Sequence, residues 1–283
     1  MSKSVAISFE GENIRIVYAS HKKGGFQIDD ILMLKDEQFD GFLEKEKIKE
    51  FIVSYHFKSF YQDIISIPTV KKKYIKKLVE AEIKKRVADF NDFSFIHLLH
   101  GEKVVENKRV LEIFVYAVKN EEINNIIKRF TSKGKFIKAI YPIALSVATT
   151  AKSIEGTFLC VTEIGLDKIL VLMKDGQIQF VRNTHSFEKG LNDFDIQNIN
   201  MTINYCRQSL RVNPSFVMLT GSICNHYSGT SLPSIPVICA LNTPNQPEVG
   251  PELLDFICPF SALFVAKGSE INLLTSEYKN FYT

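Results

Sequence analysis

The sequence predicts a two-lobed α/β fold in which one plan of strands and helices is used twice. The chain opens with two β-rich runs, 5–9 and 14–19, that flank a turn-forming cluster, and a third strand is expected at 26–34. A similar hairpin returns in the second half, where apolar strands at 157–163 and 168–174 flank a second glycine-containing turn. Segments with helical spacing of apolar residues follow each hairpin, so we expect mixed α/β lobes that face each other across a cleft.

The remaining elements of the first half are read from periodicity and from turn residues. The predicted elements are a helix at 39–55, a strand at 63–67, a basic helix from residue 69 to about 87, strands at 93–99 and 110–118, a helix from Asn120 to Gly134, a strand at 136–140 and a helix at 143–150. The basic helix and the two strands after it predict a small inserted α+β subdomain at about 70–118. The first lobe is then expected to span residues 1–150.

The second lobe is expected to span residues 151–268, and residues 269–283 form a C-terminal tail. Its predicted elements are a third strand at 177–182, a long helix that carries Ile196, Ile199, Ile203, Cys206 and Leu210, strands at 216–219 and 235–241, and a short helix at 261–267. Asp193 and Asp195 precede this long helix and are expected to cap it rather than to act as a catalytic carboxylate pair.

Composition excludes several classes of protein. The 283 residues are 45% hydrophobic and carry a net charge of +3, which gives enough apolar material for a core and no concentrated field that requires nucleic acid. The five cysteines form no C-x-x-C pair, so we expect neither a metal site nor disulfides, and a reducing compartment. No leader is evident and no apolar run reaches the ~20 residues of a membrane span, so a soluble, cytosolic chain is expected.

Three short motifs resemble the family of PilM and of the cytoplasmic part of GspL. The opening I-S-F-E-G-E-N-I-R-I-V at 7–17 lies along the PilM-type I-D-I-G-x-x-x-x-K-V-V, V-T-E-I-G at 161–165 lies along V-D-I-G, and L-T-G-S at 219–222 lies along L-T-G-G. Their order and separation agree with that family over nearly the whole chain. The resemblance implies an actin-like, ribonuclease H-like duplicated fold.

In that family the two D-I-G turns hold the phosphates and metal of ATP, and the L-T-G-G turn supports the adenosine. The resemblance therefore implies a degenerate nucleotide site. The residues expected to form it, some retained and some replaced relative to the family motifs, are Arg15, Glu163, Gly165, Gly221 and Ser222. Ser8 stands where the first acidic residue is expected, and Glu10 puts a carboxylate where glycine should admit phosphate. A carboxylate repels a triphosphate, so we expect binding of ATP and magnesium to be weak or lost and no catalytic residue to remain.

The C-terminal tail contains E-I-N-L-L, which resembles the I-N-L-L-P segment at the amino terminus of PilN, the membrane protein that PilM holds. The resemblance implies that Ile271, Asn272, Leu273 and Leu274 bind a groove of this chain or of a neighbour, as an extended peptide whose alternate apolar residues fill pockets. A fusion is then expected, in which the natural chain continues into a transmembrane helix. An ordinary terminal strand is the alternative.

The basic helix carries lysines at 71–73, 76–77 and 84–85 and an arginine at 86. This pattern indicates either that the helix binds an anionic membrane surface or an acidic partner, or that it is a solvated helix face without a partner. The resemblance implies a non-catalytic pseudo-ATPase scaffold of a type IV pilus or type II secretion platform at the inner membrane. Its expected partners are a PilN-like or GspM-like membrane protein, a motor ATPase and further copies of itself. The alternative function is an actin-like ATPase that switches or polymerises with ATP.

Overall fold

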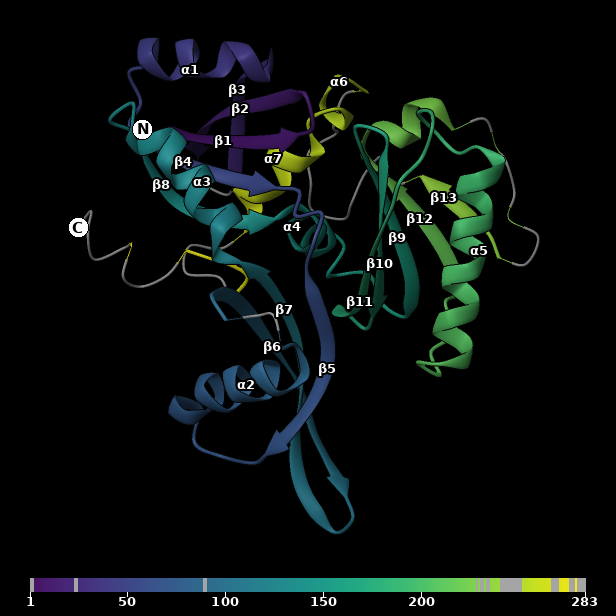
Figure 1. Cartoon of the computed structure of the whole chain (residues 1–283). Coiled ribbons are helices and arrows are strands. Elements are labelled where there is room, and N and C mark those ends of the chain that lie inside the picture. Colours follow the sequence, from purple (N-terminus) through teal and green to yellow (C-terminus); the bar gives the residue numbers. More distant parts are fainter. Residues whose placement is uncertain are drawn as a thin grey trace.

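A computed structural model describes residues 3–22, 25–88, 91–227, 229, 232, 235–239, 251–265, 270–274 and 278. The strands form two five-stranded sheets and one three-stranded sheet, here called the first, second and small sheets. Figure 1 shows the first and second sheets side by side, with the small sheet and one helix projecting away from them.

The first sheet has the strand order β3-β2-β1-β4-β8. Its strands are β1 (Lys3–Glu10), β2 (Asn13–Lys22), β3 (Gly25–Lys35), β4 (Glu50–Tyr55) and β8 (Phe136–Pro142). The first three strands form an antiparallel meander, and β4 and β8 continue the sheet in parallel with β1. Successive residues Ala6 and Ile7 of β1 are both fully buried, which requires that both faces of the sheet are covered.

The second sheet repeats this plan with the order β11-β10-β9-β12-β13. Its strands are β9 (Thr157–Ile164), β10 (Asp167–Lys174), β11 (Gln177–Thr184), β12 (Phe216–Thr220) and β13 (Val237–Cys239). Again an antiparallel meander precedes two parallel strands. The duplication predicted from the two hairpins is therefore confirmed.

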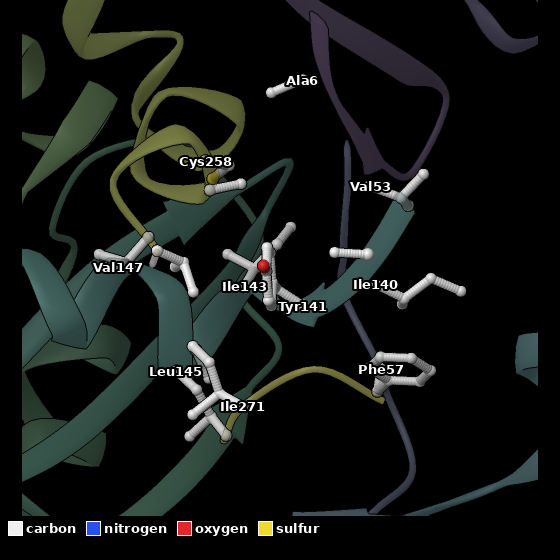
Figure 2. Packing of buried hydrophobic residues seen from close by; sticks show 14 of the residues in the cluster. Ala6, Val53, Phe57, Ile140, Tyr141, Ile143, Leu145, Val147, Cys258 and Ile271 are labelled. Atoms are coloured by element: carbon white, nitrogen blue, oxygen red, sulfur yellow. The ribbon is translucent and has the colours of Figure 1, made fainter. Parts of the chain in front are cut away.

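Helices cover both large sheets. They are α1 (Asp36–Lys45), α3 (Asn120–Thr131), α4 (Ile143–Thr150), α5 (Asp193–Gln208), a 3-10 helix η1 (Gly221–His226), α6 (Pro251–Leu254) and α7 (Ile257–Phe264). Phe39 of α1 and Phe130 of α3 meet with ring centroids 5.5 Å apart over the first sheet. Although α7 follows the second sheet in the chain, it packs against α4 and against β1, β2 and β4. Figure 2 shows Cys258 of α7 in the same apolar cluster as Ile143 and Val147 of α4.

The small sheet has the order β5-β7-β6, and helix α2 packs on it. Its elements are β5 (Tyr61–Pro68), α2 (Lys72–Arg86), β6 (Phe93–Val105) and β7 (Lys108–Lys119). Val79 and Ile83 of α2 are buried against this sheet. The small sheet starts at β5, earlier than the expected insertion at about 70–118.

The predicted helix at 39–55 is wrong in its second half. Helix α1 ends at Lys45, and 50–55 form strand β4 between β1 and β8. Phe51 and Val53 alternate with Ile52 along this strand, so the period is two and not 3.6. The ends of the predicted strand 235–241 and helix 261–267 lie outside the described residues.

All five cysteines are free thiols, and burial raises the pKa of Cys160 to about 12. Within the described ranges, no helix combines the length and apolar character that a membrane crossing requires.

Candidate functional site

The carboxylate at the second glycine turn forms an ion pair with a lysine of the same hairpin. Glu163, at the end of β9, is buried and lies directly opposite Lys168 of β10 in the antiparallel register. Lys168 Nζ donates to Glu163 Oε2 at 2.8 Å, the Gly190 amide donates to the same oxygen at 2.7 Å, and Ser222 Oγ donates to Oε1 at 3.3 Å. This carboxylate therefore has an internal cation and two further donors.

Lys168 is one of the most deeply buried side chains in the protein, and it serves more than one acceptor. Its ammonium also donates to the Glu188 carbonyl at 3.0 Å and lies 3.9 Å from Oδ2 of buried Asp195. Asp195 in turn accepts from Ser186 Oγ at 2.9 Å. Over the ranges that the structure describes, no three His, Cys, Asp or Glu side chains are arranged to hold a metal ion. The positive charge that organises this turn comes from Lys168.

The first glycine turn also has an internal ion pair. Glu10, at the end of β1, is buried and pairs with the Arg15 guanidinium, while Ser8 Oγ and the Cys258 thiol also donate to its carboxylate. Burial raises the pKa of Glu10, against the opposing effects of Arg15 and the two donors. Arg15 is thus directed at a carboxylate of its own hairpin, which competes with any phosphate for the guanidinium.

The two turns meet across the boundary between the sheets. Gly165 has a φ of +63°, and a Cβ added there would lie 3.9 Å from the Glu10 carbonyl oxygen, which is van der Waals contact. The turn that would hold phosphate on one sheet therefore lies close to the corresponding turn on the other.

The third motif is also packed against protein. Gly221 has a φ of +83° and opens η1, and a Cβ added there would lie 2.6 Å from Ile257 Cγ2 at the start of α7. Glycine is needed here for conformation and for the close approach of α7. Ser222, the next residue, points to Glu163.

The structure thus brings the five predicted residues to one region. Glu163 and Ser222 share a hydrogen bond, Gly165 lies near the Glu10 carbonyl, and Glu10 is paired with Arg15. Prediction from the motifs missed Lys168, which was read only as part of an apolar strand. A lone lysine in the run D-K-I-L-V-L-M, opposite an acidic residue of a predicted hairpin, is the signal that could have found it.

A second feature missed from sequence is a carboxylate shared by two histidines. Asp167, the first residue of β10, lies 3.1 Å from His56 Nε2 and 2.6 Å from His185 Nδ1. Burial lowers the pKa of His56, although Asp167 opposes this shift. Burial also opposes ionisation of Asp167, but the hydrogen bonds from His185 and His56 outweigh it and lower the pKa of Asp167. His56 follows β4 of the first sheet, so this contact joins the two sheets.

Other hydrogen bonds extend this junction along β11. Asn183 Nδ2 donates to the Phe57 carbonyl at 3.0 Å, the Val181 amide donates to Gln62 Oε1 at 3.3 Å, and Gln177 Nε2 donates to the His100 carbonyl at 3.0 Å. The second sheet is therefore fastened to the first sheet and to the small sheet at several separate points.

The I-N-L-L segment of the tail packs on its own chain. The Leu273 amide donates to the Ile140 carbonyl at 2.9 Å, and Asn272 Oδ1 accepts from the amides of Ile140 at 3.1 Å and Leu274 at 3.0 Å. Ile271, Leu273 and Leu274 are buried, and Figure 2 shows Ile271 in the cluster that contains Leu145. The tail thus extends the hydrogen bonding of β8, the edge strand of the first sheet.

The basic helix α2 is partly neutralised. Lys84 and Lys85 pair with Glu80 and Glu82 at 2.7 Å, and Arg86 pairs with Asp63 at 2.9 Å. The remaining lysines gather at its amino-terminal end, where the helix dipole disfavours cations, and they are exposed: Lys71, Lys72, Lys73, Lys76 and Lys77.

Comparison with solved structures decides the fold. A structure described as the PilM–PilN type IV pilus biogenesis complex matches with a TM-score of 0.69 and 11% identity, over 92% of this chain and 96% of that chain. The cytoplasmic domain of EpsL, an inner-membrane component of the type II secretion system of Vibrio cholerae, matches with a TM-score of 0.60 and 12% identity, over 98% of this chain and 100% of that domain.

The chain has the actin-like ATPase fold. A Bacteroides thetaiotaomicron protein described as having this fold also aligns, with a TM-score of 0.46 and 9% identity over 83% of this chain and 90% of that chain. No family model matches the sequence, and no curated protein matches it. The predicted structural likeness to PilM and to the cytoplasmic part of GspL-type proteins is confirmed.

Proposed function

We propose that this protein is a non-catalytic scaffold of a type IV pilus or type II secretion platform, at the cytoplasmic face of the inner membrane. In this role it links a motor ATPase to inner-membrane components. The observation that carries the proposal is the buried Lys168–Glu163 pair at the second turn. The Lys168 ammonium supplies the positive charge that a divalent metal would supply in a working site. At the first turn, the Arg15 guanidinium likewise supplies the positive charge beside Glu10.

Titration calorimetry with ATP and magnesium, taken to millimolar nucleotide, tests this proposal. We expect no saturable heat above dilution, because a triphosphate would have to displace two internal ion pairs. Saturable binding that is lost in Glu163→Gln would instead support the alternative, an ATPase that switches or polymerises with nucleotide. Glu163→Gln is chosen because it keeps the shape of the side chain while removing its charge.

We further propose that the I-N-L-L segment occupies in cis the surface that a PilN-like or GspM-like partner peptide would use. The support is the edge-strand hydrogen bonding of Asn272 and Leu273 to Ile140. A pocket of about 480 Å³ adjoins the segment, and its apolar lining includes Leu98, Met173, Ile178 and Ile271. The exposed lysines of α2 are proposed to face anionic headgroups or an acidic partner at the membrane.

A labelled peptide of residues 269–278 tests the cis arrangement by fluorescence anisotropy. We expect weak binding to the wild-type chain and stronger binding to Leu273→Asp, in which the resident segment is expelled. Equal binding to both proteins would contradict this proposal. Val104→Asp, an exposed change on β6 that adds the same single charge, is the control.

A further inference from the structure

The first sheet carries a pocket of about 470 Å³ beside helix α3, here called the α3 pocket. Its walls come from the ends of β1 and β4, the start of α1 and one face of α3. The α3 side is formed by Glu122, Asn125, Ile126 and Arg129, which follow one another at helical spacing and so share one face of that helix.

The α3 pocket lies on the opposite face of the first sheet from the ion pair of the first glycine turn. Phe9 lines the pocket, and its ring centroid lies 5.2 Å from that of Phe39 in α1. Glu10 is the next residue of β1, and it accepts from the Cys258 thiol of α7. Because successive residues of a strand point to opposite faces, Phe9 and Glu10 serve different sites.

Aromatic and aliphatic side chains supply the apolar part of the lining. Phe9 and Tyr55 are paired neighbours on the parallel strands β1 and β4, and their ring centroids lie 5.9 Å apart. Ile126 of α3 is buried beside them. The pocket therefore offers two ring surfaces and a methyl-bearing wall to an apolar group.

Glu122 brings a carboxylate to this lining that has no cation of its own. It is half-buried, and among the described residues it has neither an ion pair nor a hydrogen-bond donor. Burial raises the pKa of Glu122, Glu121 adds to this shift, and Lys119 opposes it only in part. Burial also raises the pKa of Tyr55, and the charge of Glu122 adds to that shift, so the phenol and the carboxylate lie close together.

The two cations that line the α3 pocket are engaged elsewhere. The Arg129 guanidinium donates to Asp36 Oδ1 at 2.5 Å and to Asp40 Oδ1 at 2.9 Å. Lys58 is exposed and interacts electrostatically with Asp167 of the second sheet. Glu122 is therefore the group of the pocket whose charge is left unbalanced.

We propose that the α3 pocket binds a small organic cation, a primary ammonium on an apolar stem. The ammonium pairs with Glu122, while the stem lies against Phe9 and Tyr55, whose ring faces also attract a cation. The volume falls in the range of about 300–1,000 Å³ that is usual for small-molecule sites. An anionic ligand would meet the unbalanced carboxylate and is disfavoured. This inference does not rest on the proposed scaffold role, because none of its residues belongs to the tail or to the two internal ion pairs.

A chemical-shift titration of the ¹⁵N-labelled full chain with 2-phenylethylammonium, at pH 7 and constant ionic strength, tests the proposal. We expect saturable shifts of the Phe9, Ser59 and Asn125 amides, with a dissociation constant of about 1–10 mM, as for a fragment-sized ligand. The neutral 2-phenylethanol and the anionic 3-phenylpropionate have the same aromatic stem, and each should bind at least about tenfold more weakly. Equal binding of 2-phenylethanol would overturn the assignment of a cation.

Two pairs of variants locate the site. Glu122→Gln should raise the dissociation constant at least about tenfold, whereas Glu121→Gln, which removes an exposed charge from the same helical turn outside the pocket, should change it less than about twofold. Asn125→Arg places a resident guanidinium three residues from Glu122 and should also abolish binding, whereas Asn124→Arg, on the exposed side of α3, should not. Equal affinities within both pairs would overturn the proposal.

A last comparison separates a free ligand from a lysine side chain of another protein. N-acetyl-lysine methylamide presents the same ammonium and stem as butylammonium, but the stem continues into peptide groups. We expect the blocked lysine to bind more weakly than butylammonium, because the pocket then has to admit those groups as well. Tighter binding of the blocked lysine would overturn the assignment of a small molecule in favour of a protein side chain.

Discussion

The Lys168–Glu163 pair allows a quantitative test of how the second turn is held. Lys168→Met keeps the length of the side chain but removes its charge, which leaves Glu163 buried without its cation. Loss of one member of a buried pair costs about 3–5 kcal/mol. Glu163 retains the Gly190 amide and the Ser222 hydroxyl as donors, so we expect the lower end, about 3 kcal/mol. That is a large part of the roughly 5–15 kcal/mol that stabilises an ordinary domain.

Urea unfolding at pH 7 measures this change. The matched control is Lys84→Met, which removes an exposed i,i+4 partner of Glu80 and should cost no more than about 0.5 kcal/mol. The double variant Glu163→Gln, Lys168→Met should be at least about 1 kcal/mol more stable than Lys168→Met alone, since the Glu163 carboxylate is then no longer left in the interior without its cation. If Lys168→Met destabilises no more than Lys84→Met, the internal pair does not hold the turn, and the argument that it replaces a metal fails.

Three further predictions concern the turns, the junction and the tail. Gly221→Ala should destabilise by about 2 kcal/mol in thermal unfolding, because its φ of +83° and the nearby Ile257 methyl both oppose a Cβ; Gly41→Ala in α1, which meets nothing within 4 Å, should be neutral or stabilising. Burial holds the pKa of His56 below its ordinary 6.5, so just below pH 6.5 the unfolded chain takes up a proton that the folded chain does not. The stability of the wild-type protein should therefore fall as pH is lowered, and the difference between its urea midpoints at pH 7.5 and 5.5 should be larger than the same difference in His56→Gln. Asn272→Ala should speed hydrogen exchange of the Ile140 amide relative to core amides of β1, and unchanged exchange would contradict the proposed hold on the tail.

The duplicated architecture could be predicted because the signals for the hairpin in each half lie close together in the sequence. Both hairpins combine β-rich runs with a turn that contains glycine, and these signals act within a few residues. The error at 39–55 arose because the apolar residues of two elements were read as one helix. Nine residues separate Phe51 from Phe42 and Ile52 from Leu43, about two and a half helical turns, so the two pairs lie on opposite sides of a helix. β1 and β8 provide backbone partners on both sides of Ile52–Tyr55, and those partners lie far away in the sequence.

The candidate site was predicted in position but not in content. The motifs located Glu163, Gly165 and Gly221, because the turn chemistry of glycine is visible in sequence. That Glu163 would face Lys168 could have been inferred from the hairpin register. The contact of Asp167 with His56 could not, because it depends on how two sheets meet across 111 residues of chain. Likewise, nothing local indicates that α7 would pack under the first sheet.

The attachment of the tail to β8 has a mechanical consequence. Tension applied at Leu274 would reach the Asn272 and Leu273 hydrogen bonds to Ile140 before it reached α7. From Ile140 the force would pass through the backbone ladder into β4 and then β1, the centre of the first sheet. Because Asn183 of β11 bonds Phe57 and Asp167 of β10 bonds His56, both just after β4, the second sheet would move with the first rather than swing away from it. The two sheets would then respond to tension as one rigid unit, and the first contact to break would be the one between the tail and the edge strand β8.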